Sequence, residues 1–196
     1  MQEDATGNGL LALFTAPPDY TEFDNFESLF LSSEPTHSIW PRMRAGFQIP
    51  STIEHQALLE QLAWFSKHPR YIQRVMDRAD PFIYYILEEA EKRDLPSELV
   101  LLPIVESAFQ PFAYSHGRAA GLWQFIPSTG RSYGLKQNWW YDGRRDIYES
   151  TQAALNYLER LHQIFNGDWK LALAAYNSGS GTVQRAIKRN KKLNRP

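Results

Sequence analysis

The chain has 196 residues, of which 43% are hydrophobic and 14% aromatic, enough for one domain with a sizeable core. Its 21 basic and 22 acidic residues give a net charge of −1, which excludes a general polyanion-binding surface, so we expect no nucleic-acid partner. Cysteine is absent, which excludes disulfides, thiolate zinc sites and a cysteine nucleophile. The apolar runs are too short to span a bilayer, so we expect membrane attachment only through an anchor that this chain does not contain.

The first 38 residues combine several Gly and Pro residues with acidic and polar positions, which predicts a weakly structured N-terminal arm. No Lys or Arg precedes the short apolar run 10–14, so this start lacks the basic region of a signal peptide. The composition therefore leaves open a cytoplasmic protein or a mature form that has lost its export signal. Residues 39–196 are predicted to form the functional domain.

The first half of that domain follows a helical pattern. Apolar spacing predicts a helix from Thr52 that ends before Pro69, followed by a short helix over 71–78. Asp80 as N-cap with Pro81 at the first helical position predicts a further helix that runs to residue 93. The predicted buried face of this last helix comprises Ile83, Leu87 and Ala90.

The next helix is predicted to begin at Pro96 and to carry Glu106. Pro103 would lie inside it and remove one backbone hydrogen bond, so we expect a kink there. Residues 110–137 contain many Gly and Pro residues, which predicts a loop region with one or two short helices.

The C-terminal part again favours helices. Asp146, with Glu149 three positions later, resembles a capping box for a helix over 147–165. Asp168 is predicted to cap a helix over 169–177, and a turn then leads to a last helix over 182–190. No sustained alternation of apolar and polar residues is present, so the predicted fold is all-α with at most a small hairpin. The buried face of the helix over 147–165 is predicted to comprise Ala154, Leu158, Leu161 and Phe165.

Glu106 is the residue whose chemistry stands out. It ends the apolar run 99–105, and residues 107–141 contain no Asp or Glu. A carboxylate at the end of a buried segment needs a partner or a raised pKa. This setting suits a general acid that stays protonated near neutral pH, and the alternative is an ordinary solvated Glu at a helix end.

The remaining residue types narrow the chemistry further. The five His residues lack zinc-ligand spacing, and neither a phosphate-binding loop nor a serine-hydrolase elbow is present, so we expect no metal and no cofactor. A carboxylate with hydroxyls, amides and aromatic rings is typical of a carbohydrate cleft. Six aromatic residues after Glu106 could stack on sugars or belong to the core: Trp123, Phe125, Tyr133, Trp139, Trp140 and Tyr141.

Three ordered motifs carry a family resemblance. The chain resembles the lytic transglycosylases with a goose-lysozyme-like (SLT) domain in Glu106-Ser107, Gly121-Leu122-Trp123-Gln124 and Ala175-Tyr176-Asn177-Ser178-Gly179. The similarity extends over residues 40–196. It implies an all-α, lysozyme-like helical domain with a loop-rich substrate cleft. It also implies that the later helices and the C-terminal cell-wall-binding repeats of the family are absent from this chain.

The resemblance also implies a role for each matching residue. Glu106 matches the sole catalytic acid and base. Ser115 matches a hydroxyl that faces this carboxylate and the substrate acetamido group, and Tyr176 matches a phenol that bonds the carboxylate. The other matches are a cleft amide (Gln124), an apolar side chain on the cleft floor (Ile126) and an amide that braces the motif backbone (Asn177).

The activity implied is cleavage of the β-1,4 bond between N-acetylmuramic acid and N-acetylglucosamine, with formation of a 1,6-anhydro end. Peptidoglycan glycan strands are then the partner, and the resemblance implies a monomer in the periplasm or cell envelope, associated with the outer membrane in its full-length form. Two alternatives stay open. One is a lysozyme-like hydrolase with Asp142 as second carboxylate, and the other is a non-catalytic glycan-binding domain.

Three further local features can be interpreted from the sequence. Residues Asp142, Arg144, Arg145 and Asp146 form a charged cluster that we interpret as a structural knot of ion pairs and helix capping. Arg118 occupies a position that is Gly in much of the wider superfamily, which leaves the conformation of the local turn open. The basic residues after Thr182 are interpreted as a solvated helix end, with anionic stem peptides as the alternative partner.

Overall fold

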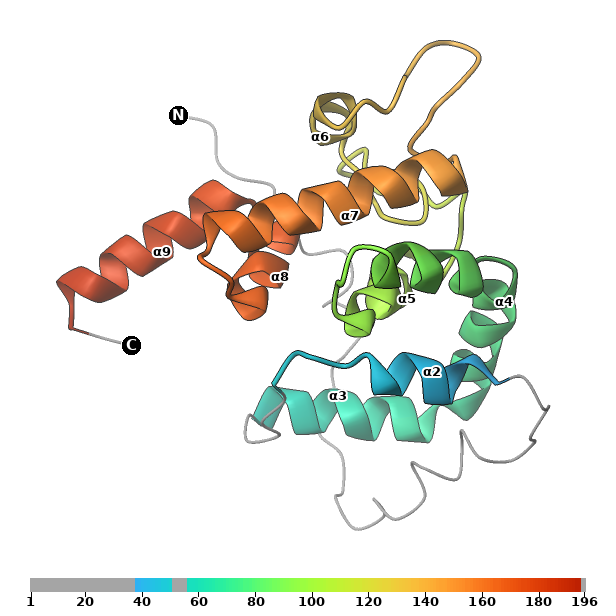
Figure 1. The fold of residues 1–196 in the computed structure, drawn as a ribbon, viewed down its shortest axis with the longest axis horizontal. Helices are drawn as coiled ribbons and strands as arrows, with labels where there is room; N and C mark the ends of the chain where they lie inside the picture. Colours follow the sequence, from blue (N-terminus) through green and yellow to red (C-terminus); the bar gives the residue numbers. More distant parts are fainter. Residues whose placement is uncertain (1–37, 51–55, 195–196) are drawn as a thin grey trace. The chain divides into compact units, whose positions relative to one another are not determined.

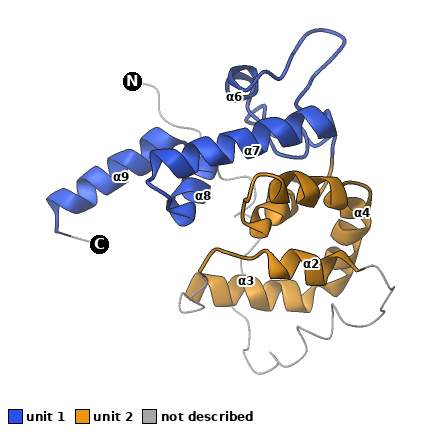
Figure 2. Cartoon of the chain, in the orientation of Figure 1, with its two compact units in different colours: residues 1–12, 111–196 blue, residues 13–110 orange. Residues whose placement is uncertain are grey.

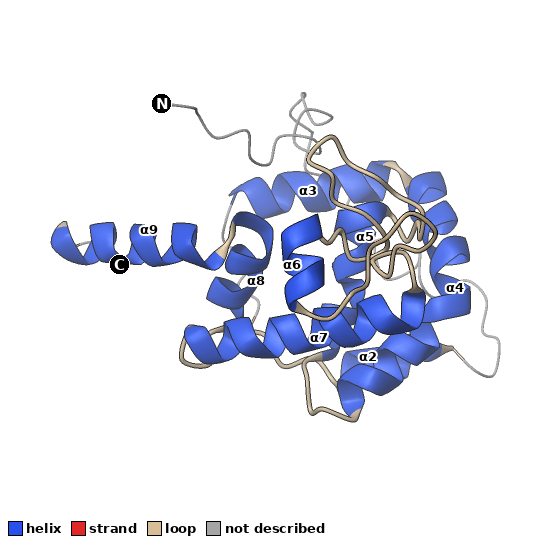
Figure 3. Ribbon diagram, turned by 90° about the horizontal axis from the view of Figure 1, so that it is seen from above, coloured by secondary structure: helices blue, strands red, loops and turns tan. Residues whose placement is uncertain are grey.

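The computed structural model describes residues 38–50 and 56–194, so the predicted arm over 1–38 lies, except for Ser38, outside the described residues. Within these ranges the regular elements are helices, and no residue belongs to a strand (Figure 3). The prediction of an all-α fold is confirmed. The chain divides into two compact units, residues 13–110 and residues 1–12 with 111–196 (Figure 2).

The unit over 13–110 contains the helices of the first half (Figure 1). Its long helix α4 buries one face with a spacing of three to four residues, as expected for an amphipathic helix. Ile83, Leu87 and Ala90 lie on this face, which confirms the predicted buried positions. The elements are α2 (Ile39–Ala45), α3 (Gln56–Lys67), α4 (Pro69–Glu91), η2 (Ser97–Leu101) and α5 (Leu102–Ser107).

Pro81 does not start a helix, contrary to the prediction. The two helices predicted over 71–78 and 80–93 are one element, α4, with Pro81 in its interior and Asp80 as an ordinary helical residue. Proline removes one hydrogen bond, here the one to the carbonyl of Asp77. The apolar stripe continues on both sides of it, through Ala79 and Ile83, and the burial of this common face keeps the helix continuous.

Pro103 does not kink a helix either. The run predicted as one helix from Pro96 is a 3-10 turn, η2, followed by the short helix α5, and Pro103 lies in the first turn of α5. A first-turn N–H has no partner within its helix, so proline costs no hydrogen bond there. The change of direction therefore precedes Pro103, and Glu106 occupies the last turn of α5.

Hydrogen bonds tie η2 to α2 and to the segment that follows it. The sequence did not predict α2. The Ser97 hydroxyl donates to the carbonyl of Met43 at 2.6 Å, and the Ser97 N–H donates to the carbonyl of Gly46 at 3.1 Å. The Glu98 carboxylate accepts the N–H groups of Gln48 and Ile49. These bonds fix η2, and through it the start of α5.

The unit that contains residues 111–194 is built on α6 (Pro127–Ser132), α7 (Ile147–Ile164), α8 (Trp169–Ser178) and α9 (Ser180–Lys192) (Figure 1). Both predicted caps are confirmed. The Asp146 carboxylate accepts the N–H of Glu149 at 2.9 Å, and Asp168 accepts that of Leu171 at 3.0 Å. The last helix begins two residues earlier than predicted, directly after Gly179, whose φ of +85° makes the turn. A shared core contains Leu161, Phe165, Ala172, Ala175 and Val183.

The loops before α7 contain isolated bridges in place of the small hairpin that the sequence allowed, at Tyr114–Ala120, Ala120–Phe125 and Gln137–Asp142. Trp123 anchors them to α7. Its ring is completely buried, and its Nε1–H donates to the Thr151 hydroxyl at 3.0 Å. Across the described ranges, each helix is too short or too polar to serve as a membrane span.

Candidate active site

Glu106 is half-buried in the last turn of α5. Its carboxyl makes no hydrogen bond or ion pair to another described residue. Burial therefore acts on it without a compensating charge and raises its pKa from 4.5 to about 7. A carboxyl group in this state can both donate and accept a proton near neutral pH.

A tight backbone turn ends the helix directly behind Glu106. The N–H of Phe109 donates to the carbonyl of Pro103, and the N–H of Ala108 donates to that of Ile104, both at 3.1 Å. These bonds span six and four residues and close a helix C-terminus that continues into left-handed backbone. Ala108 and Phe109 both adopt positive φ, 50° and 55°, a strained conformation for residues with a Cβ. The complete burial of Phe109 helps to hold this turn.

Gln124 lies in a turn of the other compact unit, the one with residues 111–194. It has a φ of 49°, and its side-chain Nε2 donates to the carbonyl of Gly121 at 2.8 Å and, more weakly, to that of Ala113 at 3.5 Å. With its N–H groups engaged, the amide presents its oxygen as an acceptor. The structure thus fixes both the position and the polarity of this predicted cleft amide.

Tyr176, in α8, is bonded to the same turn. Its hydroxyl donates to the carbonyl of Trp123 at 2.7 Å, and its ring lies 5.4 Å from the ring of Tyr157. Gln124 and Tyr176 are therefore brought together by residues 121–124. The phenol proton goes to a backbone carbonyl, and the phenol oxygen retains the capacity to accept a hydrogen bond. The bond between this phenol and the Glu106 carboxylate stays a prediction.

Ser115 closes a second turn of this unit. Its Oγ accepts the N–H of Ala119 at 3.1 Å, and its own N–H donates to the Ala119 carbonyl at 2.9 Å. The turn contains Arg118 at a φ of 62°, a conformation that glycine adopts without strain. This explains why glycine suits the position, the question that the sequence left open.

The last two predicted residues, Ile126 and Asn177, lie in the same unit. Ile126 is 47% exposed and directly precedes α6, whereas Asn177 is exposed near the end of α8. Of the six predicted site residues, the structure thus groups five in one compact unit, and Glu106 belongs to the other.

Arg144 is a residue whose structural role the sequence showed only in part. Its guanidinium is nearly buried and makes a bidentate pair with Asp142, with bonds of 2.9 and 2.7 Å. It also donates to the carbonyls of Arg118 and Phe125, at 2.7 and 3.1 Å, on either side of Gln124. The hydrogen bond from Arg144 lowers the pKa of Asp142. The predicted ion pair and helix cap are confirmed for Asp142, Arg144 and Asp146, whereas the Arg145 guanidinium lies over the Tyr114 ring; the two carbonyl contacts of Arg144 are new.

Gly121 brings the same two segments into backbone contact. A Cβ at this position would lie 1.7 Å from the carbonyl oxygen of Arg144, and the φ of +83° is itself unfavourable for other residues. Only glycine permits this approach. The motif around Trp123 and the knot around Arg144 are thus one packed structure.

The six aromatic residues after Glu106 divide between core and surface. Trp123 and Phe125 are buried and Tyr133 is half-buried, so this part of the set is core or close to it. Trp139 and Trp140 are each 90% exposed. Tyr141, 40% exposed, lies with the two tryptophans at the surface, so half of the six belong to the core or its border and half do not.

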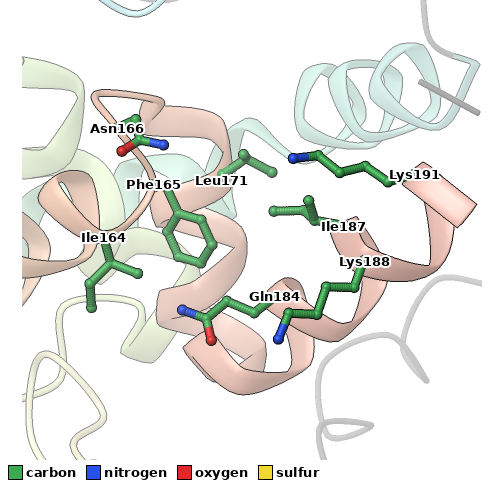
Figure 4. Close-up of a pocket in the computed structure, with 8 residues that line it drawn as sticks. All are labelled: Ile164, Phe165, Asn166, Leu171, Gln184, Ile187, Lys188 and Lys191. Atoms are coloured by element: carbon green, nitrogen blue, oxygen red, sulfur yellow. The ribbon is translucent and has the colours of Figure 1, made fainter.

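A hollow of about 480 Å³ lies where α7, α8 and α9 meet (Figure 4). Phe165, Leu171 and Ile187 contribute apolar walls, and Lys188 and Lys191 extend from α9. Its lining includes none of the six predicted site residues. Among the described residues, no group of three or more His, Asp and Glu side chains could hold a metal ion.

Residues 84–195 match the Transglycosylase SLT domain family, which is more than half of the chain. The chain belongs to this family. The assignment confirms the predicted lysozyme-like fold class of the SLT domain, and its matched range contains all six predicted site residues.

Two curated relatives agree with this assignment. Over 187 residues the SLT chain is 46% identical to membrane-bound lytic murein transglycosylase D of Escherichia coli (strain K12), covering 95% of this chain and 40% of that protein. It is 30% identical over 142 residues to membrane-bound lytic murein transglycosylase C of Haemophilus influenzae (strain PittEE), covering 66% and 40%. The solved structure of an inactive mutant of lytic transglycosylase Slt from Pseudomonas aeruginosa matches with 32% identity and a TM-score of 0.42, over 50% of this chain and 17% of that one. The chain thus spans about 40% of the length of the two curated relatives.

Proposed function

We propose that this SLT domain cleaves the β-1,4 bond between N-acetylmuramic acid and N-acetylglucosamine in peptidoglycan and leaves a 1,6-anhydro end. The observation that carries the proposal is the state of Glu106, a half-buried carboxyl that has no cationic partner among the described residues and whose pKa is raised to about 7. Membership of the SLT domain family and the names of the two curated relatives support the substrate class.

In the proposed reaction, Glu106 performs both proton transfers. Its protonated form gives a proton to the glycosidic oxygen as the bond to C1 of the muramoyl residue breaks. The muramoyl acetamido group stabilises the positive charge that develops at C1. The carboxylate of Glu106 then takes the proton of the muramoyl 6-hydroxyl while O6 bonds to C1. One residue suffices because a pKa near neutral makes each form accessible, whereas a hydrolytic glycosidase needs two carboxyl groups.

The other site residues are proposed to hold the sugars. The amide oxygen of Gln124, fixed by the bond from its Nε2 to Gly121, accepts a hydrogen bond from a sugar N–H or O–H group. Ile126 offers an exposed apolar surface to a sugar face, and Ser115 offers its hydroxyl. Tyr176 orients Glu106, and Asn177 supports the backbone of its motif. The proposed reaction uses no metal and no cofactor.

A hydrolase that uses Asp142 as second carboxylate is the weaker candidate. A general base must be available to bind the proton of a water molecule. Both oxygens of Asp142 are bonded to the Arg144 guanidinium, and this bond lowers the pKa of the carboxyl. Asp142 is thus a poor base. A non-catalytic binding domain is also disfavoured, since sugar binding does not need an unpaired carboxyl with a raised pKa.

The proposed location follows from the substrate. Peptidoglycan lies in the cell envelope, and the two curated relatives are membrane-bound by name. We therefore place this domain in the periplasm, associated with the outer membrane in its full-length form, as a monomer acting on glycan strands.

Mass spectrometry of the products tests the proposal. Purified peptidoglycan is digested with the wild-type chain and with Glu106→Gln, and one half of each digest is treated with borohydride. The expected wild-type product has an anhydro-muramoyl end, one water lighter than a hydrolysed fragment and resistant to reduction. Glu106→Gln should release almost none. Reducible muramic acid ends as the main product would establish the hydrolase instead, and binding without any product would establish the non-catalytic domain.

A further inference from the structure

Trp139 and Trp140 form an exposed aromatic pair in the loop between α6 and α7, at the tip enclosed by the bridged residues Gln137 and Asp142. Each indole is 90% exposed, more than any other large hydrophobic side chain in the described part of the chain. Single exposed apolar residues are common on protein surfaces. Two adjacent tryptophans left almost completely in water are not, and such patches often mark a binding site.

The tip that carries them is held in one conformation by hydrogen bonds. The Asn138 side-chain oxygen accepts the N–H groups of Trp140 and Tyr141, each at 2.9 Å, and the Asn138 N–H donates to the Tyr141 carbonyl at 2.9 Å. Below the tip, the Gly143 N–H donates to the Lys136 carbonyl at 2.8 Å. A ligand that binds these rings therefore finds a backbone that is already ordered.

The base of this loop is joined to the segment that carries the proposed sugar contacts. Gln137 Nε2 donates to the carbonyl of Pro127 at 3.0 Å, one residue after Ile126. Asp142 holds Arg144, which in turn donates to the Phe125 carbonyl beside Gln124. The tryptophan pair and these contacts thus belong to one hydrogen-bonded piece of a single compact unit.

We propose that the 137–142 loop is a second glycan subsite, in which Trp139 and Trp140 stack against sugar rings of the bound strand. The substrate class rests on the function proposed above. Indole faces pack well against the C–H-rich faces of pyranose rings, and the side-chain N–H groups of Asn138, whose oxygen is bonded to the backbone of the tip, provide donors beside them.

The charge of the loop favours a glycan over a lipid surface. Residues 137–141 are uncharged, and the Asp142 carboxylate is bonded to Arg144. Peripheral membrane sites combine aromatic residues with a cluster of Lys and Arg that attracts anionic headgroups. The loop has no such cluster; Lys136 is the only basic residue in 136–142.

The test compares binding to purified sacculi in the Glu106→Gln background, so that the strands are not cut. The variant Trp139→Ala/Trp140→Ala is compared with Tyr148→Ala, which removes a 66% exposed aromatic residue from α7. We expect the double variant to raise the dissociation constant about tenfold or more and the control to leave it unchanged. Replacement of both tryptophans by Phe should restore part of the affinity, and circular dichroism checks that each variant is folded.

Two results would overturn the inference. One is equal sacculus affinity of the double alanine variant and its parent. The other is a loss confined to binding of phosphatidylglycerol–phosphatidylcholine vesicles, which would make the pair a membrane contact. Failure of the proposed function is separate, because it would appear as absence of anhydro product from the chain with Glu106 intact, whereas sacculus binding does not depend on cleavage.

Discussion

Burial alone raises the pKa of Glu106. With a pKa of about 7, the side chain is divided between its acid and base forms at neutral pH. A neighbouring cation would have lowered this pKa and depleted the acid, and a second carboxylate would have supplied a separate base. Neither a cation nor a second carboxylate follows this residue closely in sequence. Under the proposed function, a single carboxyl group can therefore act first as the acid and then as the base.

The pH dependence of cleavage tests this role. We expect kcat/KM on a soluble glycan to fall as the pH rises through about 7, because the free enzyme must carry the proton on Glu106. Glu106→Gln should lower activity by about 10²–10⁴-fold with the fold intact. Steady-state rates measured between pH 5 and 9 show where kcat/KM falls. A profile that stays flat from pH 6 to 9 would contradict the assignment, as would retention of a tenth of the activity by the variant.

Tyr176 gives a second prediction for a single residue. Tyr176→Phe removes the hydroxyl that bonds the Trp123 carbonyl, and we expect kcat to fall more than KM rises, because the phenol is proposed to orient Glu106. Tyr148→Phe, which removes an exposed phenol from α7, serves as control. Steady-state kinetics on the same soluble glycan separate the two constants. If KM alone changed, the hydroxyl would contact sugar equally in the ground and transition states.

Among the structural elements, the loops between α5 and α7 depend most on backbone contacts. Gly121 lies against the Arg144 carbonyl, and the Arg144 side chain then reaches back to the carbonyls of Arg118 and Phe125. The described residues form no strand, and these loops are positioned by this close backbone approach, by the Arg144 guanidinium and by the bonds of Trp123 to Thr151 and Tyr176. The first two of these can be tested with matched variants.

Gly121→Ala should destabilise the fold by more than about 3 kcal/mol, since its Cβ would collide with a backbone carbonyl that no rotamer change can move. Gly134→Ala is a matched control, because Gly134 has a similar φ of +85° with no atom within 4 Å of the added Cβ. Its cost should be about 1 kcal/mol, the strain of the left-handed conformation alone. Urea unfolding gives both values, and equal losses would contradict the close packing.

Asp142→Asn tests the knot. The variant leaves the nearly buried Arg144 guanidinium without its anion, and we expect a loss of about 2–3 kcal/mol in the free energy of unfolding. The activity per folded molecule should stay close to that of the wild type. Since the pKa of Asp142 is lowered in the folded state, the pair stabilises the protein above the unfolded pKa of 3.8 and is lost as the pH falls through the lower folded value. A catalytic Asp142 would show the reverse pattern, intact stability with lost activity.

At the scale of the whole molecule, Glu106 links stability to pH. The folded pKa of about 7 lies above the unfolded value of 4.5, so the wild type loses stability as the pH rises between these values, by about 3 kcal/mol at most. Glu106→Gln carries no charge in either state and should escape this loss. Unfolding of both proteins in urea at pH 4 and pH 8 measures it. The variant should gain on the wild type at pH 8, and parallel behaviour would mean that the carboxyl is not desolvated.

The sequence predicted the elements whose signals are local. Asp146 and Asp168 cap their helices because a carboxylate bonds an N–H three residues later, a pattern legible without tertiary contacts. Pro81 and Pro103 misled because their effect depends on position in a helix, and tertiary burial decided where the helices run. The left-handed turn at Ala108 lacks the glycine that would have signalled it.

The candidate site was also predictable only in part. Motifs identified the residues, yet the partners of Tyr176 and Gln124 are backbone carbonyls, which leave no trace in a sequence. The exposed state of Trp139 and Trp140 could not be separated from burial either, since composition does not distinguish an indole in the core from one in water.

The knot also limits where insertions and deletions can be tolerated. Arg144 bonds the carbonyls of Arg118 and Phe125, so a change of length between these two residues would move Gln124 or break the knot. The tip at 138–140 lies outside that stretch, between Gln137 and Asp142, which are joined by an isolated bridge. Loop length and aromatic content can therefore diverge there among related domains while the proposed chemistry stays constant, which makes this tip the place where such enzymes would adapt to different cell walls.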